Sequence, residues 1–200
     1  MHIETPSSYL LASVYGLMIL IRLVYGWRAN RRGGKAVRRK EPGWSPILMT
    51  GLMILSNGAL LLAIFWPETL QAAAVPLPDG WRWFGWVLGL CMDALFVWIH
   101  QALGQNWAVG VMVKENHRLV TSGPYHWVRH PMYSALTGFS VAFFLISANA
   151  IVGLLWLAMT IASAWRVGEE EYLLTETFGT EYERYMAQTG RFLPKRWGLS

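Results

Sequence analysis

The sequence contains little charge and a single cysteine. Charged residues make up 14% of the 200 positions, whereas about a quarter is usual for soluble domains. Cys91 lies within an apolar stretch, so a disulfide framework and a cysteine metal cluster are excluded, and we expect its side chain to be buried. Hydrophobic residues make up 54% of the chain. The shortage of charge therefore indicates that lipid is part of its surroundings.

Motifs of common soluble nucleotide-binding enzymes are also missing. No G-x-G-x-x-G follows a predicted strand, and neither G-x-x-x-x-G-K-[ST] nor H-E-x-x-H occurs. These absences exclude a Rossmann dinucleotide site and the glycine loop of the common soluble methyltransferases. The five histidines are scattered along the chain, so we expect no metal site.

Long apolar stretches predict an all-α membrane protein, a single domain with about five transmembrane helices. A helix rises 1.5 Å per residue, so a ~30 Å hydrocarbon core needs roughly 20 residues. The last apolar stretch, 132–165, is too long for one span and is divided by a turn at 147–149. The predicted spans cover 9–25, 46–66, 81–99, 132–146 and 150–165. The polar segments 100–131 and 166–200 are expected to carry the cofactor site and the chemistry.

Basic residues are concentrated on one predicted side. The densest run lies at 28–40, with more at 114–129 and 166–196, whereas the loop 67–80 has none. By the positive-inside rule, the active site and the C-terminus are cytoplasmic and the N-terminus is outside, in an inner or plasma membrane. No basic region precedes the first span, which indicates a retained anchor. The basic run is interpreted as a topology determinant that attracts membrane lipids, with no nucleic acid as partner.

Two short polar motifs flank the last apolar stretch. The first is Arg129-His130-Pro131-Met132-Tyr133, where the proline suits the first turn of the fourth span. Short strands are expected before it, at 109–113 and 117–120. Arg129 and His130 would then lie at a helix N-terminus, which attracts anions. The spacing alone leaves open that Arg129 contacts lipid phosphate and that His130 only caps the helix.

The second motif follows the fifth span. If the helix continues, Arg166 and Glu170 share a face because they are four residues apart. A carboxylate and a guanidinium at the membrane face favour a polar or cationic ligand. A solvated acidic helix start remains the alternative. Asp93, inside the third span, is expected to make a structural contact with another helix.

Together these motifs resemble the isoprenylcysteine carboxyl methyltransferase family. Its signature is R-H-P-x-Y, an apolar hairpin and then E-E-x-x-L, which correspond here to 129–133, 132–165 and the run that begins with Glu170 and Glu171. The segments 103–107, 117–125 and 178–182 are also similar to the family. The resemblance extends over residues 99–195, about half of the chain. One departure is Met112, where eukaryotic members carry a glutamine.

The resemblance implies S-adenosyl-L-methionine as cofactor. It implies catalytic roles for Arg166, Glu170 and Arg129, with Arg166 also binding the substrate carboxylate. The cofactor-binding residues it implies are His117, Leu119, Val120, Tyr125, His130, Pro131, Met132, Tyr133, Glu170 and Glu171.

The resemblance implies methylation of a carboxylate on a prenylated-cysteine-like or other lipophilic substrate that enters from the bilayer. Two alternatives stay open. A phospholipid or amine N-methyltransferase is disfavoured by Arg166, because an amine acceptor gains nothing from a facing guanidinium. A nicotinamide-dependent membrane reductase is disfavoured by the paired glutamates and by the lack of an obvious cluster for a 2′-phosphate.

Overall fold

The computed structural model describes residues 6–32, 36–39, 45–106, 112–114 and 118–195. The helices in these ranges are α1 (Pro6–Arg32), α2 (Ser45–Phe65), α3 (Asp79–Leu103), α4 (Pro131–Ser147), α5 (Ala150–Trp165), α6 (Val167–Phe178) and α7 (Thr180–Gln188). Short 3-10 turns are η1 (Pro67–Ala73), η2 (Gly104–Asn106) and η3 (Gly123–His126). The strands are β1 (Ala36–Arg39) and β2 (Met112–Lys114).

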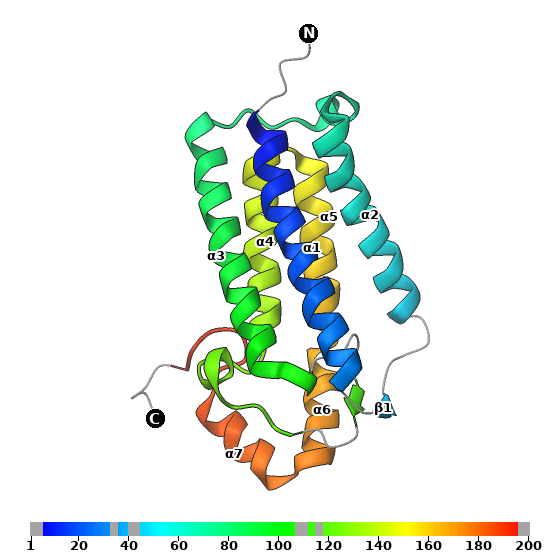
Figure 1. Cartoon of the computed structure of the whole chain (residues 1–200), viewed down its shortest axis with the longest axis vertical. Coiled ribbons are helices and arrows are strands. Elements are labelled where there is room, and N and C mark those ends of the chain that lie inside the picture. The colour runs from blue at the N-terminus through cyan, green and yellow to red at the C-terminus, as the bar shows by residue number, and fades with distance from the viewer. Residues whose placement is uncertain (1–5, 33–35, 40–44, 107–111, 115–117, 196–200) are drawn as a thin grey trace.

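Helices α1–α5 form a bundle, and α6, α7 and both strands lie at its lower end (Figure 1). Each of the five predicted apolar stretches forms a helix, and the all-α membrane class is confirmed. Helices α1, α2, α3 and the run 150–178 are long and apolar enough to cross a membrane. Helix α4, with 17 residues, is an apolar helix below that length. The chain is thus an integral membrane protein whose polar segments gather at one end.

The turn between α4 and α5 lies at the predicted position. Ala148 adopts a left-handed conformation (φ 47°) and its N–H bonds to the Phe144 carbonyl, which ends α4. The Asn149 side chain then accepts hydrogen bonds from the backbone N–H groups of Ile151 and Val152 and so caps α5. Its amide also donates to the Leu70 carbonyl at 2.8 Å. These contacts join the hairpin to the η1 loop.

Small residues let α3 pack closely against its neighbours. A Cβ on Gly85 would lie 2.7 Å from the Leu145 Cβ, and one on Gly89 2.7 Å from a Val14 methyl. Below them, Phe96 packs edge-on against Phe139, with ring centroids 5.7 Å apart. Helix α3 is therefore packed closely against α1 and α4, which holds α4 in place.

Replacing Gly85 by valine is expected to destabilise the bundle by about 1–3 kcal/mol, because the branched side chain must push α4 away. Gly16→Val is the matched control, since nothing lies within 4 Å of a Cβ there. Unfolding in mixed micelles measures both variants. Equal stability of the two would contradict the close α3–α4 contact.

Two predictions about this region are wrong. Cys91 is exposed, because the buried stripe of α3 consists of Gly85, Gly89, Asp93, Phe96, Ile99 and His100, and Cys91 faces away from it. Residues 118–120 form no strand. The Asn106 side-chain amide instead bonds the Arg118 backbone, donating to its carbonyl at 3.2 Å.

Two other predictions have mixed outcomes. Part of the predicted strand 109–113 is present as β2, which pairs antiparallel with β1 from the basic segment. Positions 107–111 lie outside the described residues. Asp93 is buried, 2% exposed, and within the described part of the chain neither carboxylate oxygen has a hydrogen-bond partner, so the expected contact with another helix is not observed there.

Candidate active site

A cavity of about 430 Å³ opens among the lower halves of the helices. Its apolar part is lined from α1, α2 and α5 by Met18, Ile19, Met49, Met53, Trp156 and Met159. Its polar part is lined by the connector after α3, the start of α4, and α6 and α7. The volume lies in the range of small-molecule sites, roughly 300–1,000 Å³.

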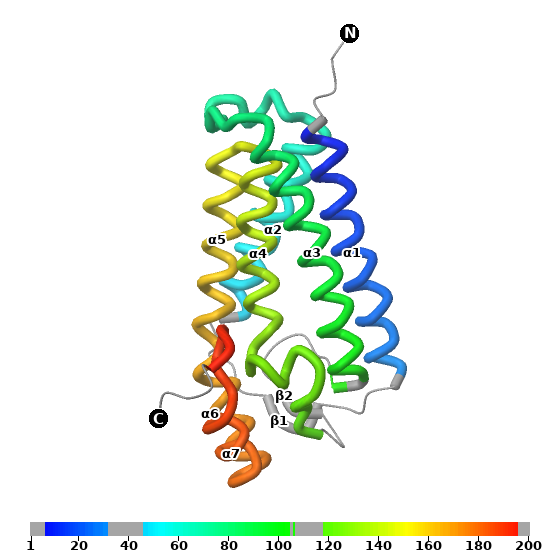
Figure 2. Tube along the Cα trace, turned by 90° about the vertical axis from the view of Figure 1, so that its left-hand side faces the viewer, coloured from blue at the N-terminus to red at the C-terminus, as the bar shows by residue number. Residues whose placement is uncertain are grey.

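The first motif is held at the cavity by the C-terminal segment. The Arg129 N–H donates to the Gly190 carbonyl at 2.8 Å, and the His130 N–H to the Arg191 carbonyl at 3.1 Å. One turn into α4, the Ser134 hydroxyl donates to the Phe192 carbonyl at 2.9 Å. Figure 2 shows this segment rising from α7 towards the start of α4. Residues 190–192 therefore form a strap that fixes the motif.

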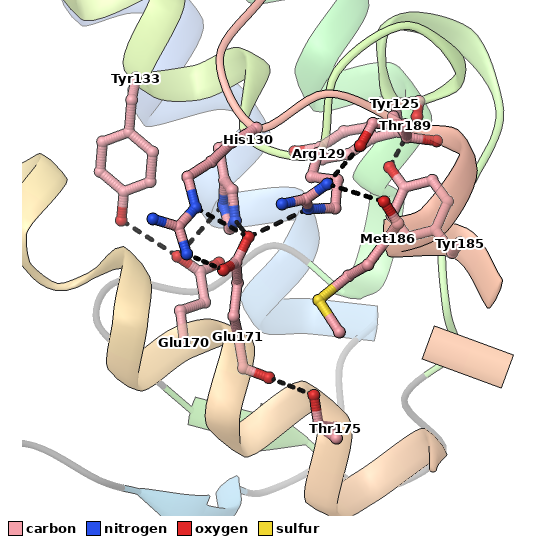
Figure 3. Close-up of polar contacts among 11 residues, drawn as sticks. Tyr125, Arg129, His130, Tyr133, Glu170, Glu171, Thr175, Tyr185, Met186 and Thr189 are labelled. Atoms are coloured by element: carbon pink, nitrogen blue, oxygen red, sulfur yellow. Dashed lines mark hydrogen bonds and ion pairs between the residues drawn. The ribbon is translucent and has the colours of Figure 1, made fainter. Parts of the chain in front are cut away.

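Beneath the motif, three basic side chains contact the Glu171 carboxylate (Figure 3). Its carboxylate lies 3.0 Å from Arg129 Nε and 3.2 Å from His130 Nε2, and it also pairs with Arg191. The Glu171 side chain is only 9% exposed. Burial raises the pKa of its carboxyl, but hydrogen bonds from His130, Arg191 and Arg129 outweigh burial and hold the pKa well below its usual range.

Arg129 has further partners within the strap. Its Nη1 donates to the Met186 carbonyl at 3.2 Å and to the Thr189 carbonyl (Figure 3). The Arg129 side chain is 12% exposed. Arg129 thus ties α4, α6 and the C-terminal segment together while touching the cavity wall.

Glu170 faces the cavity, unlike its neighbour. The Tyr133 hydroxyl donates to Glu170 Oε2 at 3.1 Å, and His130 Nδ1 lies 3.7 Å from the same oxygen (Figure 3). The Glu170 side chain remains 36% exposed. Burial, and then the nearby Glu170, raises the pKa of the Tyr125 hydroxyl well above its ordinary value, so the phenol stays protonated. The Glu170 carboxylate is thus accessible to a ligand in the cavity and is surrounded by aromatic side chains.

The structure brings most predicted residues to one place. Leu119, Val120, Tyr125, Arg129, His130, Met132, Tyr133, Arg166 and Glu170 all line the cavity. Pro131 is buried at the first turn of α4, and Glu171 lies behind the wall, so neither lines it. His117 lies outside the described residues. Arg166 occupies the junction of α5 and α6.

Sequence reasoning missed several wall residues. Tyr182 and Tyr185 project from α7, and the Tyr185 hydroxyl donates to the Tyr125 carbonyl at 2.6 Å. Asn57 on α2 accepts a hydrogen bond from the Tyr15 hydroxyl at 2.7 Å. The three-residue spacing of the tyrosines and the polar Asn57 in an apolar span were the available signals. Arg22 on α1 also lines the cavity.

Comparison with known proteins agrees with this geometry. The sequence model of the isoprenylcysteine carboxyl methyltransferase (ICMT) family matches residues 86–176, which include both motifs. The protein-S-isoprenylcysteine O-methyltransferase of Homo sapiens is 32% identical over 139 residues, covering 66% of this chain and 45% of the human protein. The part of the chain that carries both motifs is therefore similar to isoprenylcysteine carboxyl methyltransferases.

For a plant relative, the match covers a larger share of the relative's own length. Protein-S-isoprenylcysteine O-methyltransferase A of Arabidopsis thaliana is 27% identical over 161 residues, covering 76% of this chain and 81% of that protein. The solved structure of a eukaryotic intramembrane Ras methyltransferase of the family matches with a TM-score of 0.56 and 20% identity. That match covers 99% of this chain and 71% of the other, and it supports the shared fold. The chain spans about half the length of the mammalian relatives it matches.

Proposed function

We propose that this protein transfers a methyl group from S-adenosyl-L-methionine to the carboxylate of a prenylated-cysteine-like or other lipophilic substrate. The observation that carries the proposal is a cavity that joins the motif residues and Arg166 to an apolar lining from three helices. The match of residues 86–176 to the family model supports the same reaction class.

The residues of the polar part fit the cofactor. S-adenosyl-L-methionine has a cationic sulfonium, a polar amino-acid end and an adenine ring. Glu170 offers an exposed carboxylate for positive charge, and Tyr125, Tyr133, Tyr182 and Tyr185 offer aromatic surface. Leu119, Val120 and Met132 add apolar wall. The wall is proposed to be completed by Arg129 and His130. It is proposed to be supported from behind by Pro131 and Glu171.

When bound, the cofactor supplies an electrophilic methyl group, so that an O–CH₃ bond forms as the S–CH₃ bond breaks, leaving a methyl ester and a neutral thioether. Protein groups need only orient the acceptor and exclude water. We assign the first task to Arg166, whose guanidinium suits bidentate binding of a carboxylate. The apolar lining from α1, α2 and α5 would hold the lipid tail. No proton transfer is required of any side chain.

The proposed location of the site is the cytoplasmic membrane face, with the N-terminus outside. The polar connector, α6, α7 and the basic strand β1 all lie at the same end of the bundle (Figure 1). The positive-inside rule assigns such an end to the cytoplasm. Membrane lipids and an acceptor arriving from the bilayer are the proposed partners.

The proposal is tested by transfer of a radiolabelled methyl group to a synthetic N-acetyl-S-farnesylcysteine in detergent. A carboxyl ester is expected, and mild alkali releases its label as methanol. An N-methyl product would resist alkali, so alkali-stable label on lipid extracts would replace the proposal with amine methylation.

Replacing Glu170 by glutamine is expected to weaken S-adenosylhomocysteine and S-adenosylmethionine binding, the latter by roughly 10- to 100-fold. The reason is the loss of charge-assisted contacts, worth about 1.5–3 kcal/mol. Glu176→Gln is the control, because that glutamate is on the exposed face of α6. Unchanged S-adenosylmethionine affinity in Glu170→Gln would remove this residue from the cofactor site.

A further inference from the structure

Arg22 on α1 is a charged residue that the proposed reaction has not used. It lines the same cavity as Arg166, next to its helix neighbours Met18 and Ile19. Among the described residues, arginine ion pairs are made by Arg82, Arg129 and Arg191, but not by Arg22. A half-buried guanidinium among apolar helices is costly unless an anion pairs with it.

The other described arginines of α1 with visible side chains behave differently. Arg28 and Arg31 are exposed and lie over the rings of Tyr25 and Trp27, at 5.5 and 4.0 Å from the ring centroids. Arg22 precedes Arg28 by six residues, which places it about 9 Å farther along the helix. It therefore lies deeper in the bundle and faces the cavity rather than the lower surface.

Among the described wall residues, Arg22 has no carboxylate partner. Arg129 is paired with Glu171, as described above. Of the described wall residues, Glu170 is the one carboxylate, and the site proposed for the sulfonium already uses it. The guanidinium of Arg22 then has no carboxylate partner among the described wall residues. An acceptor whose tail lies among Met18, Met49, Met53 and Met159 would place its head group near Arg22 and Arg166.

We propose that Arg22 is a second carboxylate-binding residue of the acceptor site, so that the acceptor head is held between α1 and the α5–α6 junction. This inference rests on the proposed function. Arg22 then determines specificity, because a lipid with a neutral head would leave the Arg22 guanidinium without a counter-charge. The acceptor class is an amphiphile with a free carboxylate next to an apolar tail.

The test compares binding of N-acetyl-S-farnesylcysteine with binding of its neutral methyl ester, at saturating S-adenosylhomocysteine so that no reaction occurs. The wild type is expected to prefer the acid. Arg22→Met is expected to lose roughly tenfold or more in affinity for the acid, with unchanged affinity for the ester and for S-adenosylhomocysteine. Arg28→Met is the matched control on the same helix and should keep wild-type preference.

Retention of the wild-type preference in Arg22→Met would overturn the inference. So would a selective loss of S-adenosylhomocysteine affinity, which would assign Arg22 to the cofactor. If Arg22→Met does not fold, Arg22→Gln is measured in the same way, and retained preference overturns the inference again. Failure of the unmutated protein to bind S-adenosylhomocysteine would instead contradict the proposed function, so the two failures are distinguishable.

Discussion

Replacement of Arg166 by alanine is expected to lower kcat roughly 100- to 1,000-fold while leaving the affinity for S-adenosylhomocysteine unchanged. Arg166 lies on the cavity wall at the α5–α6 junction, one helical turn before Glu170. In the proposed reaction it fixes the acceptor carboxylate in line with the methyl group. Loss of one such preorganised donor typically costs a factor of this size. Single-turnover methyl transfer and calorimetric binding measure the two effects separately.

A positioning role predicts partial rescue by lysine. Arg166→Lys keeps the charge but loses the bidentate fork, so its kcat should lie between those of wild type and Arg166→Ala. Arg184→Ala on the exposed face of α7 is the matched control and should be fully active. If Arg166→Ala lost cofactor affinity in proportion to its rate, the residue would belong to the cofactor site and the assignment would fail.

Replacement of Glu171 by glutamine is expected to destabilise the folded protein by about 3–5 kcal/mol. The substitution removes the shared negative partner of Arg129, His130 and Arg191, all of which converge on one buried carboxylate. Arg129, whose side chain is only 12% exposed in the folded protein, would lose its carboxylate partner. Reversible unfolding in mixed micelles gives the change in free energy.

Glu170→Gln is the matched control for Glu171→Gln, because Glu170 is the adjacent residue but is 36% exposed. It should change stability by much less. An equal effect of the two substitutions on unfolding would contradict the account of the buried cluster.

The contribution of Glu171 to the free energy of unfolding should also depend on pH. Its hydrogen bonds hold the folded pKa below the unfolded value, about 4.3. A depressed carboxyl pKa contributes stability that is present above the unfolded value and is lost as pH falls through the folded value. The difference in unfolding free energy between wild type and Glu171→Gln should therefore be constant near neutral pH and shrink below about pH 4.

Much of the helical framework could be predicted because its cause is local. A stretch of apolar residues must form a helix in lipid, where backbone groups have no other partners. The turn at 147–149 could also be predicted from the sequence, since asparagine is a strong helix cap and Asn149 caps α5. The residues of the two motifs were found because they lie in short polar segments beside long apolar ones.

The different roles of the two adjacent glutamates could not be predicted from the sequence. Glu170 and Glu171 are the same residue type, yet one faces the cavity and the other the strap. Successive residues on a helix point about 100° apart, and only the tertiary packing decides which direction meets Arg129 and Arg191. The pairing of β1 with β2 could not be predicted either, because the short basic segment that forms β1 shows no alternating pattern of apolar and polar residues.

The central claim is tested most directly by calorimetric titration of the detergent-purified protein with S-adenosylmethionine and S-adenosylhomocysteine, with NADPH as the control ligand. We expect one site that binds the sulfur cofactors, with S-adenosylmethionine weakened in Glu170→Gln, and no heat from NADPH. Binding of NADPH with no response to S-adenosylhomocysteine would contradict the methyltransferase assignment and would favour a reductase built on the same fold.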